Sequence, residues 1–221
     1  MSDQCAVPQF FTDADFVGAA SVFDAIWGWE LEEADDDARA ALALLYTAGA
    51  VAGANWVRVI RSEAEGEVLA LLCAAIKPEA TPESAASQHD GSRYAALALH
   101  YREALSQSAV GRRILDFYAQ IDAVNAKLLG ELKAKNLGWD AELKLLITSP
   151  AARGKGYASR LVEDCLHEVV ARGGRWCMLL TDTHCAWQYY EKTGWHQDAR
   201  CRWEDESGIL GFAYREDAAS L

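Results

Sequence analysis

The sequence predicts an α/β (α+β) fold, in which helices cover both faces of a mixed central sheet. Three observations predict it. Strand-like apolar runs alternate with segments of helical periodicity along the chain. An apolar strand before Thr148 leads through a glycine-containing turn into a clear amphipathic helix, Tyr157–Arg172. Two strand-like segments joined by a polar turn end the chain. This alternation places a sheet between helical layers.

The N-terminal part is expected to contain one short strand and two helices. Ala6–Phe11 forms the strand, and Thr12 or Asp13 then caps a helix that runs to about Trp27. A second helix begins at Asp35–Asp37, whose negative charges suit the positive end of the helix dipole.

The middle of the chain predicts a hairpin, a loop and a helical insertion. Asn55–Arg61 and Val68–Ile76 form the hairpin, with Gly66 in a turn that needs positive φ. Lys77–Ser92 contains two prolines and is expected to be a loop. Two helical patterns then occupy about 93–135. Asn136-Leu137-Gly138 ends them, with the glycine as the stop.

The remaining elements complete one predicted domain over residues 1–221. They are a strand at Leu143–Ile147, the helix Tyr157–Arg172 ended by Gly173-Gly174, a strand at Trp176–Leu180, a short helix at His184–Lys192, and a hairpin of Trp195–Trp203 with Ile209–Tyr214. The expected order is therefore β-α-α-β-β-(α-α)-β-α-β-α-β-β.

Composition limits the function classes. The chain has 221 residues, of which 51% are hydrophobic, and a formal net charge of -12. The apolar content supports a packed core. An acidic surface disfavours nucleic acid as a partner, because phosphate contacts need clustered Lys and Arg. The charge itself is explained either by solubility or by a cationic amine substrate.

Location and metal content are also constrained. Met1–Gln9 lacks a basic segment followed by an apolar run, and no uncharged apolar stretch of about 18 residues occurs. We therefore expect a cytoplasmic protein with no membrane partner. Six cysteines are scattered without a Cys-x-x-Cys pair or zinc-ligand spacing. We expect reduced cysteines and no metal.

The turn Arg153–Ala158 is the main candidate for ligand binding. Its glycines allow the backbone to approach an anion, and the following helix directs free N–H groups and its positive end toward it. Two other nucleotide motifs fit worse. No Gly-x-x-x-x-Gly-Lys-Ser/Thr loop is present, and Ser159 stands where a dinucleotide fingerprint has Gly or Ala.

Three segments together resemble one known family. They are the strand end Leu146–Pro150, the pattern Arg153-Gly154-Lys155-Gly156-Tyr157-Ala158, and Tyr190-Glu191-Lys192-Thr193-Gly194-Trp195. Over about 141–203 they resemble the GNAT superfamily of N-acetyltransferases, with Trp195 where the family usually has Phe. The resemblance implies a GNAT-like mixed, mostly antiparallel central sheet with a helical insertion, about 93–135, before the fourth strand.

The resemblance also implies a donor site. The co-substrate is acetyl-CoA and the acceptor is a primary amine of a small molecule or peptide. Backbone groups of Ile147 and Thr148 pair with the pantetheine arm. Thr183 stands where many relatives have an Asn that touches pantetheine, which makes that contact less certain. The pyrophosphate is held by the N–H groups of Arg153, Gly154, Lys155, Gly156, Tyr157 and Ala158.

For the catalytic groups the resemblance leaves alternatives open. Tyr190 occupies the general-acid position, and a phenol is protonated at neutral pH; the other interpretation is a tyrosine packed behind the sheet. Glu142, six residues before Thr148, matches the base of part of the family, and an exposed glutamate at a strand start is the other interpretation. His184 and a water relay are further candidates for the base.

The favoured function is an acetyltransferase that joins donor and amine in a ternary complex. A non-catalytic acyl-CoA-binding regulatory module on the same fold is the alternative, and an interaction protein built on the 93–135 helices is a third. The acceptor pocket is expected from the first two helices, the 77–92 loop and the insertion. Dimerisation through the last hairpin is an open expectation. Candidate pocket residues are Trp27, Trp29, Trp139 and Trp187.

Overall fold

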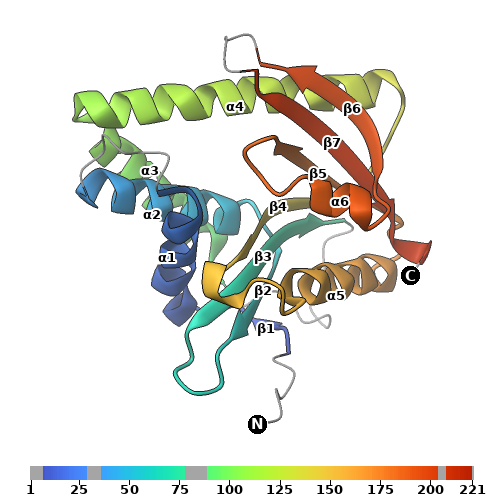
Figure 1. The fold of residues 1–221 in the computed structure, drawn as a ribbon, viewed down its shortest axis with the longest axis horizontal. Coiled ribbons are helices and arrows are strands. Elements are labelled where there is room, and N and C mark those ends of the chain that lie inside the picture. Colours follow the sequence, from blue (N-terminus) through green and yellow to red (C-terminus); the bar gives the residue numbers. More distant parts are fainter. Residues whose placement is uncertain (1–6, 29–35, 78–88, 204–207, 221) are drawn as a thin grey trace.

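The computed structural model describes residues 7–28, 36–77, 89–203 and 208–220. Within them, seven strands form one sheet in the order β1-β2-β3-β4-β5-β7-β6 (Figure 1). The strands are β1 (Gln9–Phe10), β2 (Trp56–Arg61), β3 (Val68–Ile76), β4 (Ala141–Thr148), β5 (Trp176–Asp182), β6 (His196–Arg202) and β7 (Leu210–Asp217). All neighbouring pairs are antiparallel except β4 and β5. The predicted mixed, mostly antiparallel sheet is confirmed.

The helices also follow the predicted order. They are α1 (Phe16–Trp27), α2 (Asp36–Ala52), α3 (Gly91–Ser106), α4 (Ala109–Ala134), α5 (Tyr157–Ala171) and α6 (Gln188–Lys192). In the described part of the chain, none is both long enough and apolar enough to cross a membrane. No group of three metal-ligating side chains gathers there either.

The two halves of the sheet part between β4 and β5. These strands pair only where Ala141–Leu143 lies beside Cys177–Leu179. Leu143 pairs with Ala74 and Leu145 with Cys73, so Lys144 forms a bulge in β4. A bulge bends its strand and increases the local twist. Beyond it, the β4 edge that faces β5 has no strand partner among the described residues.

Helices cover both faces of the sheet, as predicted (Figure 1). One face of β2–β4 packs against α1, α2 and α3 in a core that includes Phe23, Leu42 and Leu145. The opposite face packs against α5 through Leu161, Cys165 and neighbouring residues. The long helix α4 packs along β6 and β7. Burying one aliphatic side chain contributes about 1.5–3 kcal/mol, so these contacts fix the helices on the sheet.

Two local predictions need correction. The residue with left-handed backbone after α4 is Asn136, with φ of 54°, and not Gly138. Leu137 N–H donates to the Leu132 carbonyl at 2.9 Å, so a Schellman motif forms with Asn136, ahead of the glycine, at its left-handed position. Residues 184–187 precede α6 in a turn, since the Cys185 N–H donates to the Asp182 carbonyl at 3.1 Å. The predicted helix from His184 was therefore too long.

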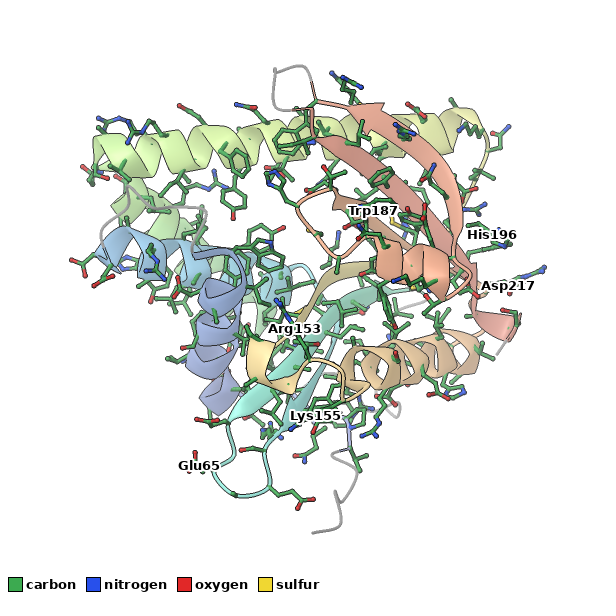
Figure 2. The ribbon with its side chains drawn as sticks, viewed as in Figure 1. Glu65, Arg153, Lys155, Trp187, His196 and Asp217 are labelled. Carbon is green, nitrogen blue, oxygen red and sulfur yellow. The ribbon has the colours of Figure 1, made fainter. Side chains whose placement is uncertain are left out.

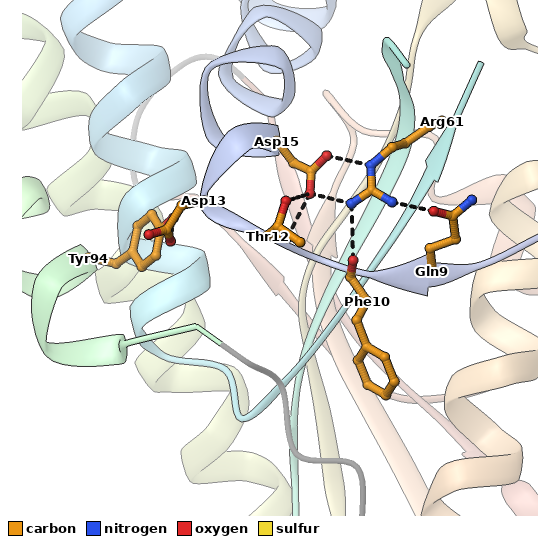
Figure 3. A network of polar contacts seen from close by, with 7 residues as sticks. All are labelled: Gln9, Phe10, Thr12, Asp13, Asp15, Arg61 and Tyr94. Atoms are coloured by element: carbon orange, nitrogen blue, oxygen red, sulfur yellow. Dashed lines mark hydrogen bonds and ion pairs between the residues drawn. The ribbon is translucent and has the colours of Figure 1, made fainter. Parts of the chain in front are cut away.

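An ion-pair network anchors the N-terminal segment to β2 (Figure 3). Arg61 donates to both carboxylate oxygens of Asp15, through Nε at 2.6 Å and Nη2 at 2.5 Å, and to the Phe10 carbonyl at 3.1 Å. Thr12 donates its N–H to Asp15 at 2.7 Å, which completes a capping box at the start of the helical segment. The network thereby fixes the entry into α1, one wall of the cavity described below.

Candidate active site

A cavity of about 900 Å³ lies where β4 and β5 part. Its floor is formed by the diverging strands, from Leu143 to Thr148 and from Leu179 to Asp182. One end is formed by the turn before α5, and the other by side chains of α1, α2 and α4. Tyr189 and Tyr190 of α6 also line it. The opening of the sheet therefore connects a helix N-terminus on one face with a helical pocket on the other.

The turn before α5 presents free backbone donors. Gly154 and Gly156 have φ of 77° and 75°, and a Cβ at either position would meet no atom within 4 Å. Gly156 is the N-cap of α5 and has no side chain to accept the first N–H groups. The first donor of the helix that is satisfied is Arg160, 3.1 Å from the Gly156 carbonyl. An N-terminus without a capping side chain keeps its donors for an anion.

Two basic residues belong to this turn (Figure 2). Arg153 lines the cavity, whereas Lys155 does not. Arg160, one turn into the helix, lies over the Tyr157 ring with 5.7 Å between guanidinium carbon and ring centroid. The turn therefore combines backbone donors, the helix dipole and positive charge, which is the chemistry that a pyrophosphate requires.

The exposed edge of β4 continues from this turn. Ile147 and Thr148 both line the cavity, and β4 is paired there only with β3, through Leu71 and Ala70. Their free side is a strand edge, which can receive an extended amide-containing chain as an added strand.

Tyr190, the predicted general acid, lines the cavity. Its ring packs on Trp195 and Tyr214, with centroid distances of 5.5 and 5.8 Å. Burial raises the pKa of Tyr190 well above its usual value, and the neighbouring Cys185 and Tyr189 add to this. Its hydroxyl has no hydrogen-bond partner among the described protein groups. The side chain at the cavity is protonated at neutral pH, as a phenol already is at its ordinary pKa.

Two other predicted site residues, Glu142 and Thr183, lie outside the cavity lining. Glu142 forms an ion pair with Lys144 at 2.7 Å. The Thr183 hydroxyl accepts the Leu210 N–H at 3.2 Å.

Among the tryptophans, Trp187 stacks on Phe212 and Trp139 packs against the core beside α4. Trp27 does line the cavity, and Trp29 lies outside the described residues. His184 lines the cavity next to Phe117, with 6.4 Å between ring centroids.

Comparison with known proteins identifies the family. Residues 87–215 match the family model described as acetyltransferase (GNAT) domain. The chain belongs to the GNAT acetyltransferase family. None of the curated proteins compared with it matches its sequence significantly.

Solved structures agree with this GNAT fold. One is an insect protein from the mosquito Aedes aegypti named as arylalkylamine N-acetyltransferase 7, with a TM-score of 0.58, 13% identity, and coverage of 96% of this chain and 86% of that one. A second, from Corynebacterium glutamicum, is named histone acetyltransferase HPA2 and related acetyltransferase. Its TM-score is 0.52 at 18% identity, and the match covers 96% of this chain and 95% of that one. A third is an aminoglycoside 6'-N-acetyltransferase complexed with coenzyme A. Its TM-score is 0.52 at 12% identity, and the match covers 96% of this chain and 97% of that one.

The helical half of the cavity in this GNAT protein contains residues that sequence reasoning missed. Phe23, Tyr46 and Tyr118 form a connected aromatic group, with centroid distances of 4.8 Å and 5.3 Å between successive rings. Asp182, the last residue of β5, also lines the cavity. In the sequence, these aromatic residues cannot be distinguished from ordinary core positions of amphipathic helices. Asp182 fell just beyond the predicted strand end, and its position after an apolar strand was the available signal.

Proposed function

We propose that this protein is an acetyl-CoA-dependent N-acetyltransferase that transfers an acetyl group to a primary amine by direct attack in a ternary complex. The observation that carries the proposal is one cavity that joins a free helix N-terminus, an open strand edge and a protonated tyrosine. We regard residues 1–221 as one GNAT domain.

The donor half of the site follows from the backbone. The N–H groups from Gly154 to Ala158 bind the pyrophosphate. The Arg153 N–H donates to the Pro150 carbonyl at 3.4 Å, so Arg153 adds the charge of its side chain at the cavity. The free edge of β4 at Ile147 and Thr148 binds the pantetheine amides as an added strand. The gap between β4 and β5 then directs the thioester toward the helical half of the cavity. Because these contacts are mainly with the backbone, they require glycine in the turn more than any particular side chain.

The chemistry combines a bond exchange at the carbonyl carbon with polarisation of the carbonyl oxygen and two proton transfers. The neutral amine attacks the thioester carbonyl, forming the amide C–N bond, and the C–S bond breaks. A strand N–H near Thr148 polarises the carbonyl oxygen. Tyr190 gives its proton to the departing sulfur, because a phenol is protonated at neutral pH. The amine proton passes to a base, for which Glu142, His184 and a water relay are the candidates.

The proposal is tested by measuring CoA release with a panel of polyamines, amino acids, aminoglycosides and peptide N-termini. We expect turnover with at least one amine. CoA binding without turnover on any amine, including the arylalkylamine used below, would favour a non-catalytic regulatory module.

The role of Tyr190 is tested with Tyr190→Phe. We expect kcat to fall by about 10²-fold or more, since general acid catalysis typically contributes that much, while the Kd for CoA changes little. The matched control is Tyr189→Phe, which removes a neighbouring hydroxyl that bonds to Ser159 at 3.2 Å. Unchanged turnover in Tyr190→Phe would remove this residue from the mechanism.

A further inference from the structure

The helical half of the cavity has a defined chemical character. Its walls are aromatic and aliphatic side chains from three different helices. Phe23 and Trp27 come from α1, Tyr46 from α2, and Phe117, Tyr118 and Ile121 from α4. Phe23 also contacts Trp27, with 4.8 Å between ring centroids, so the aromatic group is continuous. Such a surface binds an apolar or aromatic body, and the faces of its rings favour a nearby cation.

One carboxylate interrupts this wall. Within the described lining residues, Asp182 is the only acidic side chain. It stands at the end of β5, on the strand face that carries Met178 and Leu180 toward α4. Its Oδ1 accepts the His184 N–H at 2.8 Å. Asp182 and Tyr46 both line the cavity, and burial, Cys185 and Asp182 raise the pKa of Tyr46.

The described part of the chain provides no cationic partner for Asp182. Among the described residues, no Lys, Arg or His forms an ion pair with it. Lys144, the cationic residue of the cavity on β4, places its ammonium 2.7 Å from Glu142 instead. Arg153 belongs to the turn before α5, at the donor end. A carboxylate at an aromatic wall gains most from a cation that enters with the ligand, because burying unpaired charge is costly.

We propose that the acceptor is a primary amine on an aromatic or apolar body, and that Asp182 binds its ammonium group. The ammonium then gives one proton to the base, and the neutral amine attacks. This inference rests on the proposed transferase function. The aromatic walls receive the body, and Asp182 positions the nitrogen where β4 and β5 part, opposite the donor turn. Strongly hydrated polycations such as spermidine fit this cavity poorly, since its described lining includes one carboxylate and mostly apolar walls that offer little to replace their water. Anionic acceptors are disfavoured by Asp182 and by the net charge of -12.

The test measures binding of 2-phenylethylamine and of its neutral analogue 2-phenylethanol to the full chain saturated with CoA, by titration calorimetry. For the wild-type protein we expect the amine to bind at least 10-fold more tightly than the alcohol. In Asp182→Asn this preference should disappear. Asp116→Asn is the matched control, since Asp116 is an exposed residue on α4 beside Phe117 and does not line the cavity. It should keep the preference.

The inference is overturned if the wild-type protein binds neither compound, binds both equally, or keeps its preference in Asp182→Asn. The wild-type comparison decides the matter even if Asp182→Asn does not fold. CoA release separates this inference from the transferase proposal. Turnover of spermidine but not of 2-phenylethylamine leaves the transferase intact and removes the acceptor class. Asp182-dependent binding without turnover of any amine leaves the ammonium site intact and removes the transferase proposal.

Discussion

Gly156 is the residue on which the donor turn depends most directly. Its φ of 75° lies in the left-handed region, which a side chain makes costly by about 1–2 kcal/mol. We expect Gly156→Ala to shift this backbone and to weaken CoA binding by about 10-fold or more, because the first N–H groups of α5 are misdirected. Calorimetric titration with CoA measures the effect.

Gly66→Ala is the control for that experiment. Gly66 has a similar φ of 68° with open space around it, but it lies in the turn between β2 and β3. Both variants should lose stability to a similar extent, and only Gly156→Ala should lose CoA affinity. Equal CoA affinity in the two variants would contradict the anion-binding role of the turn.

The charges of the same turn are predicted to act unequally. Arg153 lines the cavity and Lys155 does not, although both carry a positive charge. We expect Arg153→Glu to weaken CoA binding by about 10-fold at low salt, with a smaller effect of Lys155→Glu and a difference that shrinks as salt rises. A CoA titration at two salt concentrations measures this. Unaltered CoA binding in Arg153→Glu would exclude the assigned role.

At the scale of elements, the Asp15–Arg61 pair holds the first helical segment on the sheet. Asp15 is 5% exposed, and removing one partner of such a pair costs about 3 kcal/mol. Burial raises the pKa of Asp15, but hydrogen bonds from Arg61 and Thr12 outweigh it, so the pKa lies below its usual value. A lowered carboxyl pKa stabilises the fold above the unfolded-state pKa, about 4, and this stabilisation is lost as pH falls through the folded-state pKa.

We therefore expect Asp15→Asn to lower the free energy of unfolding at pH 7, and the gap from wild type to narrow below about pH 4. Urea unfolding at several pH values measures both. The control is Asp24→Asn, whose partner is Arg39 in a pair that is about one-third exposed on both sides. Its effect should be under about 1 kcal/mol. A gap that does not change with pH would contradict the assignment to the Asp15 charge.

The end of α4 gives a second prediction at this scale. Asn136 occupies the left-handed position of the Schellman motif, where glycine carries no Cβ penalty. Asn136→Gly should raise the free energy of unfolding by a few tenths to about 1 kcal/mol, measured by urea unfolding. Gly138→Ala is the companion variant, because Gly138 has no left-handed φ and open space around it. A large loss of stability in Gly138→Ala would contradict the observed helix end.

At the scale of the whole molecule, the function depends on how the sheet opens. The strands that part, β4 and β5, leave an edge that a bound pantetheine arm would cover. We expect CoA to slow hydrogen exchange in Lys144–Thr148 and in the turn before α5, while β3 amides paired on both sides change little. Exchange measured with and without CoA tests this. Equal slowing across the sheet would indicate general stabilisation instead.

Much of this architecture follows from local sequence patterns. The strand Val68–Ile76 and the helix that begins at Tyr157 coincide with β3 and the start of α5, because a continuous apolar run and a strong helical stripe are local signals. The positive φ of Gly66 was also predictable, since a tight turn favours it and glycine adopts it without a Cβ penalty. The helix end at Asn136 was missed because Asn and Gly compete for that position and only the hydrogen bonds decide between them.

The candidate site was predictable only on its donor side. By itself, the sequence determined the order of the elements, and it predicted the turn before α5 and the tyrosine of α6 as candidate site residues, since each is encoded in a short segment. The tertiary structure alone decided the opening between β4 and β5, the pairing of Glu142 with Lys144, and the meeting of Asp182 with aromatic residues of α1, α2 and α4. Those residues are far apart in the chain, and their proximity results from packing helices against a bulged, twisted sheet, which no local pattern records.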